Sequence, residues 1–173
     1  LLSPTGMGSD RISGRLDRNR LGMVGHSLGG KISFLVAQAD ARVKAVLGID
    51  PVDQRDPSAA SGMSKIKLPA GVPIGYLGET VSQTGGMPCA PANANYEVLY
   101  KASPSPAFSI TFNGAAHMDF VDNPAMCWNC GFCGTGTAPK DRTNKLAIKY
   151  TAAYFLSTIG GDRRAVDSLS GVD

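Results

Sequence analysis

The segment LGMVGHSLGGKISFLVA, residues 21–37, constrains the fold of this chain more than any other stretch. Its first four residues predict a short buried strand, and residues 27–39 predict a helix because their apolar side chains recur at helical spacing. Between them lies a Gly-x-Ser-x-Gly turn centred on Ser27. A strand, a sharp turn at a serine and a helix form a nucleophile elbow, in which the serine hydroxyl stands above the sheet.

The residues around Ser27 suit such a turn. We expect Gly25 and Gly29, which lack side chains, to let the turn close and the helix pass near the strand. The N–H of Leu28 would lie at the helix N-terminus, where it is a candidate donor to an oxyanion. The competing interpretation is a glycine-rich turn with an incidental serine.

The rest of the chain alternates strands with helices. Strands are predicted at 43–50, 72–79 and 107–114, helices at 96–102 and 145–161, and a polar tail at 162–173. Because several strands are apolar throughout, this order predicts an α/β fold with a mostly parallel sheet and flanking helices. We expect residues 1–173 to form a single domain.

Composition excludes several classes of protein. The chain has 173 residues, is 43% hydrophobic and carries a net charge of only +3, which is typical of a globular domain. Its basic residues are scattered and no aromatic platform accompanies them, so we expect no nucleic-acid partner. No apolar run approaches the roughly 20 residues that span a bilayer. We expect neither a cofactor nor a resident metal.

The chain has only two histidines, and a nucleophilic serine needs a base. His26 lies beside Ser27 inside the elbow, so its side chain should point away from the serine and pack or bond elsewhere. His117 follows the last predicted strand, in a loop at the sheet end where α/β folds assemble their sites. His117 is therefore the candidate base.

The residues alone leave three candidates for the acid that would orient the histidine. Asp50, Asp53 and Glu79 all lie at or just beyond the ends of predicted strands, and any of them could serve. Asp119 and Asp122 follow His117 so closely that they should not reach the far ring nitrogen.

Five blocks in sequence carry a family resemblance. GHSLGGK, AVLGIDPVD, YLGE, CAPANANYEVLY and NGAAHMDFVDN together resemble chlorophyllases and the related bacterial chlorophyllase-like, dienelactone-hydrolase-like esterases over residues 21–156. The resemblance implies an α/β-hydrolase fold. It also implies hydrolysis of carboxylic esters by Ser27, His117 and Asp50, with Glu79 as the reserve acid.

The implied mechanism is acyl transfer through an acyl-enzyme, with a small-molecule or lipid-like ester as the substrate. Leu28 stands where plant chlorophyllases usually have arginine, so a general esterase, a lipase-like enzyme or a polyester hydrolase fits as well as a chlorophyllase. Met118, Phe120, Trp128 and Phe132 either line an apolar pocket or pack as ordinary loop residues. A base with a free imidazole's pKa of about 6.5 would give activity that rises through the neutral range.

Four cysteines, Cys89, Cys127, Cys130 and Cys133, support two interpretations. They form either disulfides, in one of three pairings, or one zinc site with four thiolate ligands. We favour disulfides, and a bridge from Cys89 to the other three would hold the histidine loop beside the serine. Disulfides indicate an oxidising compartment, so we expect a secreted protein, with a plastid location as the alternative.

Only 20 residues precede the predicted elbow strand. A whole α/β-hydrolase has several strands before this one and takes its second oxyanion donor from a loop among them. We therefore expect the N-terminal strands to be missing from this chain, and the chain to pair with the missing half or with itself. The alternative function is a catalytically inactive fragment or a non-catalytic binding version of the fold.

Overall fold

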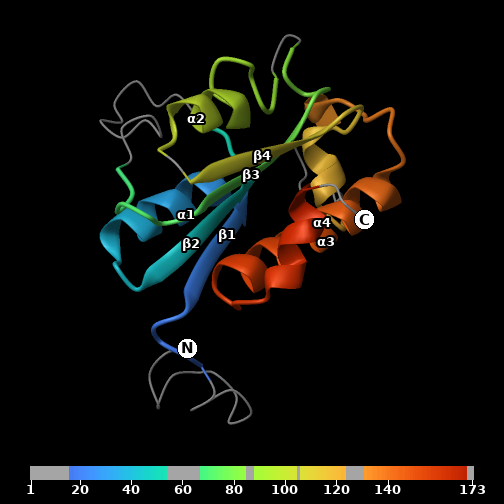
Figure 1. The fold of residues 1–173 in the computed structure, drawn as a ribbon. Coiled ribbons are helices and arrows are strands. Elements are labelled where there is room, and N and C mark those ends of the chain that lie inside the picture. The colour runs from blue at the N-terminus through green and yellow to red at the C-terminus, as the bar shows by residue number, and fades with distance from the viewer. Residues whose placement is uncertain (1–15, 54–66, 85–87, 105, 124–130, 171–173) are drawn as a thin grey trace.

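The computed structural model describes residues 16–53, 67–84, 88–104, 106–123 and 131–170. Four strands form one sheet in the order β1-β2-β3-β4, and every neighbouring pair is parallel. They are β1 (Leu21–His26), β2 (Val43–Ile49), β3 (Ile74–Glu79) and β4 (Ala107–Phe112). The carboxyl ends of all four strands therefore lie at the same end of the sheet, as Figure 1 shows.

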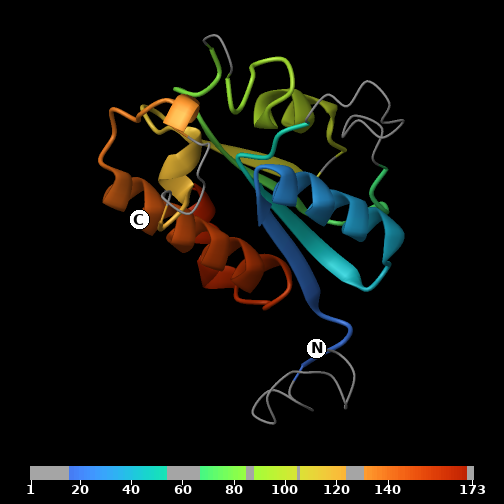
Figure 2. The ribbon, with the colours of Figure 1, turned by 180° about the vertical axis from the view of Figure 1, so that it is seen from behind.

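Helices cover both faces of the sheet. Helices α1 (Leu28–Ala39) and α2 (Tyr96–Ala102) lie on one face, and α3 (Lys140–Thr158) and α4 (Asp167–Ser170) on the other (Figures 1 and 2). Alternate residues of β2 contribute to the two cores, with Val46 packed on the α1 side and Leu47 on the α3 side. A sheet that is buried on both faces needs apolar residues throughout its inner strands, which explains the continuous runs in the sequence.

Several predicted boundaries differ from the structure by two or three residues: β1 ends at His26 instead of 24, β3 begins at Ile74 instead of 72, β4 ends at Phe112 instead of 114, and α3 ends at Thr158 instead of 161. Two larger differences lie in the C-terminal part of the chain. Helix α3 begins at Lys140 instead of 145, because Pro139 starts it and its first turn is polar, with no apolar periodicity to detect. Residues 162–170 are not a simple tail: a 3-10 helix (Arg163–Val166) precedes α4, Ala165 is buried, and Leu169 packs against the core on the α3 side. Among the described helices, none is long and apolar enough to cross a membrane.

Candidate active site

Ser27 joins β1 directly to α1 in a strained conformation. Its φ of 57° and ψ of −126° lie in a region that residues with side chains rarely adopt. The backbone N–H of Ser27 donates to the carbonyl of Ile49 at 3.0 Å, which ties the turn to β2. The structure thus contains the predicted strand, turn and helix, with Leu28 as the first helical residue.

Close approach of neighbouring atoms explains two glycines of the elbow. A Cβ on Gly25 would lie 2.2 Å from the carbonyl oxygen of Gly29, and one on Gly30 would lie 2.7 Å from Cβ of Pro51. A Cβ on Gly29 would meet no atom of the described residues within 4 Å. The prediction for Gly25 is confirmed, but the second crowded glycine is Gly30 and not Gly29.

Asp50 and His117 are in direct contact. Asp50 follows β2 with a φ of 41° and is fully buried. Its Oδ2 lies 2.5 Å from Nδ1 of His117, which begins a short 3-10 helix (His117–Phe120) after β4 and is 4% exposed. Burial lowers the pKa of His117 well below its ordinary 6.5 and raises the pKa of Asp50. The ring is therefore neutral near pH 7, the form that can accept a proton.

The other candidate acids have different partners. Glu79 ends β3 and is fully buried, and its Oε2 accepts the backbone N–H groups of Val81 and Ser82. Burial raises the pKa of Glu79 to about 7. Asp53 forms an ion pair with Lys31 at 2.9 Å.

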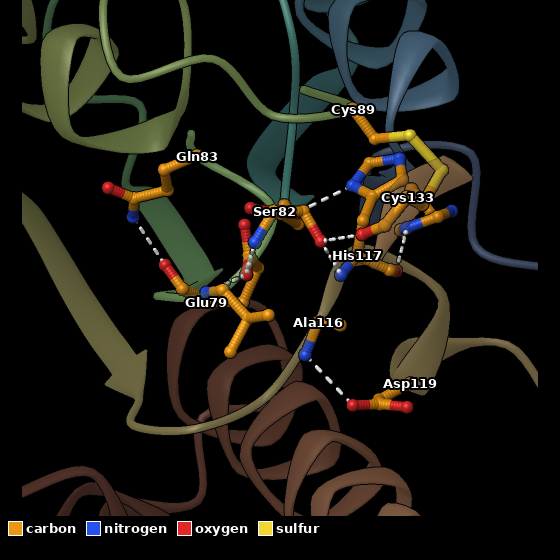
Figure 3. Close-up of polar contacts among 11 residues, drawn as sticks. Glu79, Ser82, Gln83, Cys89, Ala116, His117, Asp119 and Cys133 are labelled. Carbon is orange, nitrogen blue, oxygen red and sulfur yellow. Dashed lines mark hydrogen bonds and ion pairs between the residues drawn. A yellow bond between two sulfur atoms is a disulfide. The ribbon is translucent and has the colours of Figure 1, made fainter. Parts of the chain in front are cut away.

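The two carboxylates that follow His117 bond to groups other than its ring, as expected. Asp119 accepts the N–H of Ala116 at 2.8 Å, and Figure 3 shows this contact. Asp122 accepts a hydrogen bond from the side chain of Asn144 at 3.0 Å.

His26 packs against His117, with ring centroids 4.4 Å apart. Its Nε2 lies 2.9 Å from the His117 carbonyl oxygen, so that nitrogen carries the proton and donates it. Burial, and then the proximity of His117, lower the pKa of His26 to about 4. His26 is thus the packed and hydrogen-bonded neighbour that the sequence predicts.

Ser27, Leu28 and His117 line one cavity of about 370 Å³. Its other walls are mostly apolar, and they comprise Val52, Asp53, Pro88, Cys89, Pro91, Asn93, Ala94, Phe132 and Cys133. Of the predicted pocket residues, Phe132 lies in this wall. Phe120 instead packs edge-on against Phe112, with ring centroids 5.3 Å apart. Met118 is not among the described wall residues, and Trp128 lies outside the described part of the chain.

A disulfide joins Cys89 to Cys133, with their Cα atoms 5.0 Å apart (Figure 3). It connects the segment after β3 to the segment that follows the His117 helix, and both cysteines line the cavity. A four-thiolate zinc site would lack two of its ligands, because these sulfurs are bonded to each other. Cys127 and Cys130 lie outside the described residues.

Sequence reasoning missed Ser82, which is 3% exposed and lies beside both His117 and Cys133 (Figure 3). Its Oγ accepts the backbone N–H of His117 at 2.8 Å and donates to the carbonyl oxygen of Cys133. Nothing in the polar stretch ETVSQTGG distinguishes this serine from an ordinary loop residue.

The groups that line the cavity suit acyl transfer. Such a reaction needs a nucleophilic hydroxyl, a neutral base that a carboxylate orients, and N–H donors for the developing oxyanion. Ser27 has a hydroxyl at the cavity wall, and the His117–Asp50 pair offers an imidazole in contact with a carboxyl group. The first N–H groups of α1 have no partner within the helix.

Comparison with known proteins agrees with this chemistry. The sequence model of the chlorophyllase family matches residues 11–170. Chlorophyllase-2 of Arabidopsis thaliana is 28% identical over 121 residues, and Chlorophyllase-1 of the same plant is 28% identical over 165 residues. These alignments cover 61% and 83% of this chain, but only 38% and 50% of the two plant proteins.

A solved structure is also similar. A ferulic acid esterase from Streptomyces cinnamoneus superposes with a TM-score of 0.60 at 25% identity, over 91% of this chain and 45% of the esterase. The fold is the α/β-hydrolase fold. The chain spans half or less of the length of each of these three proteins.

Proposed function

The chain belongs to the chlorophyllase family, and on that premise we propose that it is the catalytic part of a carboxylic ester hydrolase with Ser27 as the nucleophile. The observation that carries the proposal is the 2.5 Å contact between His117 and Asp50 at the wall of the cavity that Ser27 also lines. The family match and the similarity to an esterase support the reaction class.

The first half of the reaction uses the ring nitrogen of His117 that does not face Asp50. Nδ1 bonds to Asp50, so Nε2 is the nitrogen available to take the Ser27 proton. The serine oxygen then bonds to the ester carbonyl carbon, and the carbonyl oxygen becomes an oxyanion. The Leu28 N–H, at the start of α1, donates to that oxyanion.

In the later steps the protonated ring of His117 acts as the acid. The imidazolium gives its proton to the leaving oxygen of the ester as the C–O bond breaks, which releases the alcohol and leaves an acyl group on Ser27. A water molecule then gives a proton to the same nitrogen as its oxygen attacks the acyl carbonyl. The imidazolium returns that proton to the Ser27 oxygen as the bond between this oxygen and the acyl carbon breaks, which releases the acid and regenerates the serine.

The cavity suggests the substrate class. Its wall is mostly apolar, with Phe132, Leu28 and Val52 among its side chains. A site of this kind binds the apolar part of an ester and uses a few polar groups to orient the carbonyl. We therefore propose a small-molecule or lipid-like ester as the substrate.

The β1 side of the fold suggests the partner. β1 is an edge strand, and Val24, Leu28 and Ile32 on β1 and α1 are 44%, 47% and 52% exposed. Exposed apolar side chains beside an open strand edge are sites of association. Because the relatives are about twice as long, we propose that further chain of the same hydrolase covers this side, and that residues 1–173 form one domain with it. Self-association through β1 is the competing outcome.

The disulfide bears on the compartment. A bridge between Cys89 and Cys133 persists where the environment is oxidising. We therefore propose that the protein is secreted.

The direct test is hydrolysis of p-nitrophenyl esters by the full-length protein and by Ser27→Ala. The wild type should turn over, and the variant should lose at least about 1,000-fold in kcat with its fold intact. Ser157 lies on α3, and its hydroxyl donates to the carbonyl of Tyr154 at 2.9 Å. Ser157→Ala serves as the control and should match the wild type. A wild type that binds esters without turnover would indicate a non-catalytic version of the fold.

A further inference from the structure

We propose that Ser82 is a positioning residue whose hydroxyl couples the main chain of His117 to the Cys89–Cys133 disulfide. The bridge then sets the placement of the histidine through this one side chain. The inference rests on the proposed function, because it assigns Ser82 a role in the reaction of Ser27 and His117.

Every polar group of Ser82 has a partner. Its N–H donates to Glu79 Oε2 at 2.7 Å, and its carbonyl accepts the N–H of Ala90 at 3.0 Å. Its hydroxyl accepts from the N–H of His117 and donates to the carbonyl of Cys133 (Figure 3). A serine hydroxyl has one proton to donate, so its bond to Cys133 fixes the direction in which its lone pairs face His117.

These bonds connect Ser82 to both arms of the disulfide, by which we mean the two chain segments that carry Cys89 and Cys133. Ala90 directly follows Cys89, and Cys133 is the other half of the bridge. One arm therefore bonds to the Ser82 main chain and the other to its side chain. No other bond of a described residue joins the His117 N–H to the bridge, so we expect a shift of either arm to reach His117 through Ser82.

The two residues before Ser82 also bond to the chain that leads to His117. Thr80 Oγ1 accepts the N–H of Gly114 at 2.9 Å, and the N–H of Val81 donates to the carbonyl of Ala115 at 3.1 Å. Three successive residues of the turn after β3 thus bond to the chain after β4, and the Ser82–His117 bond is the third of these contacts. The first two contacts fix the residues that precede His117 in the chain, and the third fixes the main chain of His117 itself.

Burial determines how much the hydroxyl matters. Ser82 is 3% exposed, so Ser82→Ala leaves the His117 N–H and the Cys133 carbonyl without this partner in a buried place. A shift of a reacting group by about 1 Å costs on the order of 100-fold in rate. We expect Ser82→Ala to lower kcat by about 10- to 100-fold and to leave KM within about twofold.

The experiment compares kcat in four forms of the full-length protein: wild type, Ser82→Ala, the paired variant Cys89→Ala with Cys133→Ala, and the combination. Because the bridge acts through Ser82, the combination should lose no more than the greater single loss, instead of the product of the two. Ser103→Ala is the matched control. Its hydroxyl also makes two hydrogen bonds, to Tyr76 and Leu99, but it lies outside the cavity wall, and its kcat should match the wild type.

A second readout does not need turnover. The proton between His117 Nδ1 and Asp50 should give a downfield proton NMR signal, assigned by its loss in Asp50→Asn. This signal should move or broaden in Ser82→Ala and in the paired cysteine variant, and stay unchanged in Ser103→Ala. If the wild type does not turn over, the proposed function fails while this signal still tests Ser82.

Folded Ser82→Ala with wild-type kcat and an unchanged signal would overturn the inference, as would losses that multiply in the combination. If Ser82→Ala does not fold, the paired cysteine variant decides. An unchanged kcat and signal in that variant would overturn the inference equally.

Discussion

Ser27 and His117 line the same cavity, but the two regions that carry them are held in different ways. The serine region depends on its backbone: a non-glycine residue at φ 57°, a strand that follows directly into a helix, and glycines at close approach. The histidine region depends on polar contacts across the chain. Asp50 lies 67 residues before His117, Ser82 lies 35 before it, and the disulfide spans 44 residues.

The difference shows which region tolerates which change. A backbone turn fails when an atom is added where the chain has no room for it. A polar network fails when a donor or an acceptor is removed and its buried partner is left without a bond. The serine region should therefore be sensitive to added bulk, and the histidine region to lost hydrogen bonds.

The largest expected effect is a difference in kcat between variants of two buried carboxyl groups, Asp50 and Glu79, which lie at the ends of neighbouring strands. Asp50→Asn should lower kcat by about 10,000-fold, because the amide no longer holds the ring of His117 in the correct tautomer. Glu79→Gln should stay within about tenfold of the wild type, because the amide oxygen still accepts the N–H groups of Val81 and Ser82. Steady-state kinetics on both variants measures the contrast. The reverse ranking would make Glu79 the acid.

Two glycines test the serine region. Gly25→Ala places a Cβ 2.2 Å from the carbonyl oxygen of Gly29, a main-chain atom that can move only if the turn itself shifts. It should lower the free energy of unfolding by about 3 kcal/mol. In Gly29→Ala the added Cβ lies in open space on a helix, so this variant should raise the free energy of unfolding by up to about 1 kcal/mol. Urea denaturation of both variants decides, and equal losses would contradict the close-approach account.

The histidine region should also show a pH-dependent stability. The pKa of Glu79 rises from 4.5 to about 7 on folding, so the folded state binds that proton more tightly than the unfolded chain does. Wild-type stability is therefore lost as the pH rises through this range. Glu79→Gln does not titrate, and its advantage over the wild type should grow from pH 4.5 to 7 by at most about 3 kcal/mol. Denaturation at pH 5 and pH 8 tests this, and a constant difference would refute it.

The smallest expected effect is on the acidic side of the profile of kcat/KM against pH. Because burial lowers the pKa of His117, the ring stays neutral below pH 6.5. The profile of kcat/KM against pH should then fall only at more acidic pH than a free imidazole would give, which revises the rise through neutrality that the sequence suggests. Circular dichroism at each pH controls for unfolding. A midpoint at 6.5 would show that burial does not act on this ring.

The same contrast explains what the sequence could predict. The elbow is local, so its strand, turn and helix can be found within one stretch of the sequence, and the apolar runs of the other strands indicate a parallel sheet. The exception within the elbow is Gly30, which is crowded because Pro51 folds back onto it from β2. Contacts from distant parts of the chain cannot be found by periodicity.

The histidine region is such a case. His117 could be chosen because the chain has only one other histidine, and Asp50 could be chosen over Glu79 only through a family resemblance. Ser82 could not be chosen at all, since its role depends on where Cys133 and His117 lie in space.

Labelling with a fluorophosphonate tests the central claim, that Ser27 is activated by His117, most directly. The full-length protein is incubated with the probe, and peptide mass spectrometry locates and times the adduct. Our account predicts one adduct, on Ser27, and at least a 100-fold slower reaction in His117→Ala. An adduct on another serine, or equal rates with and without the His117 imidazole, would contradict it.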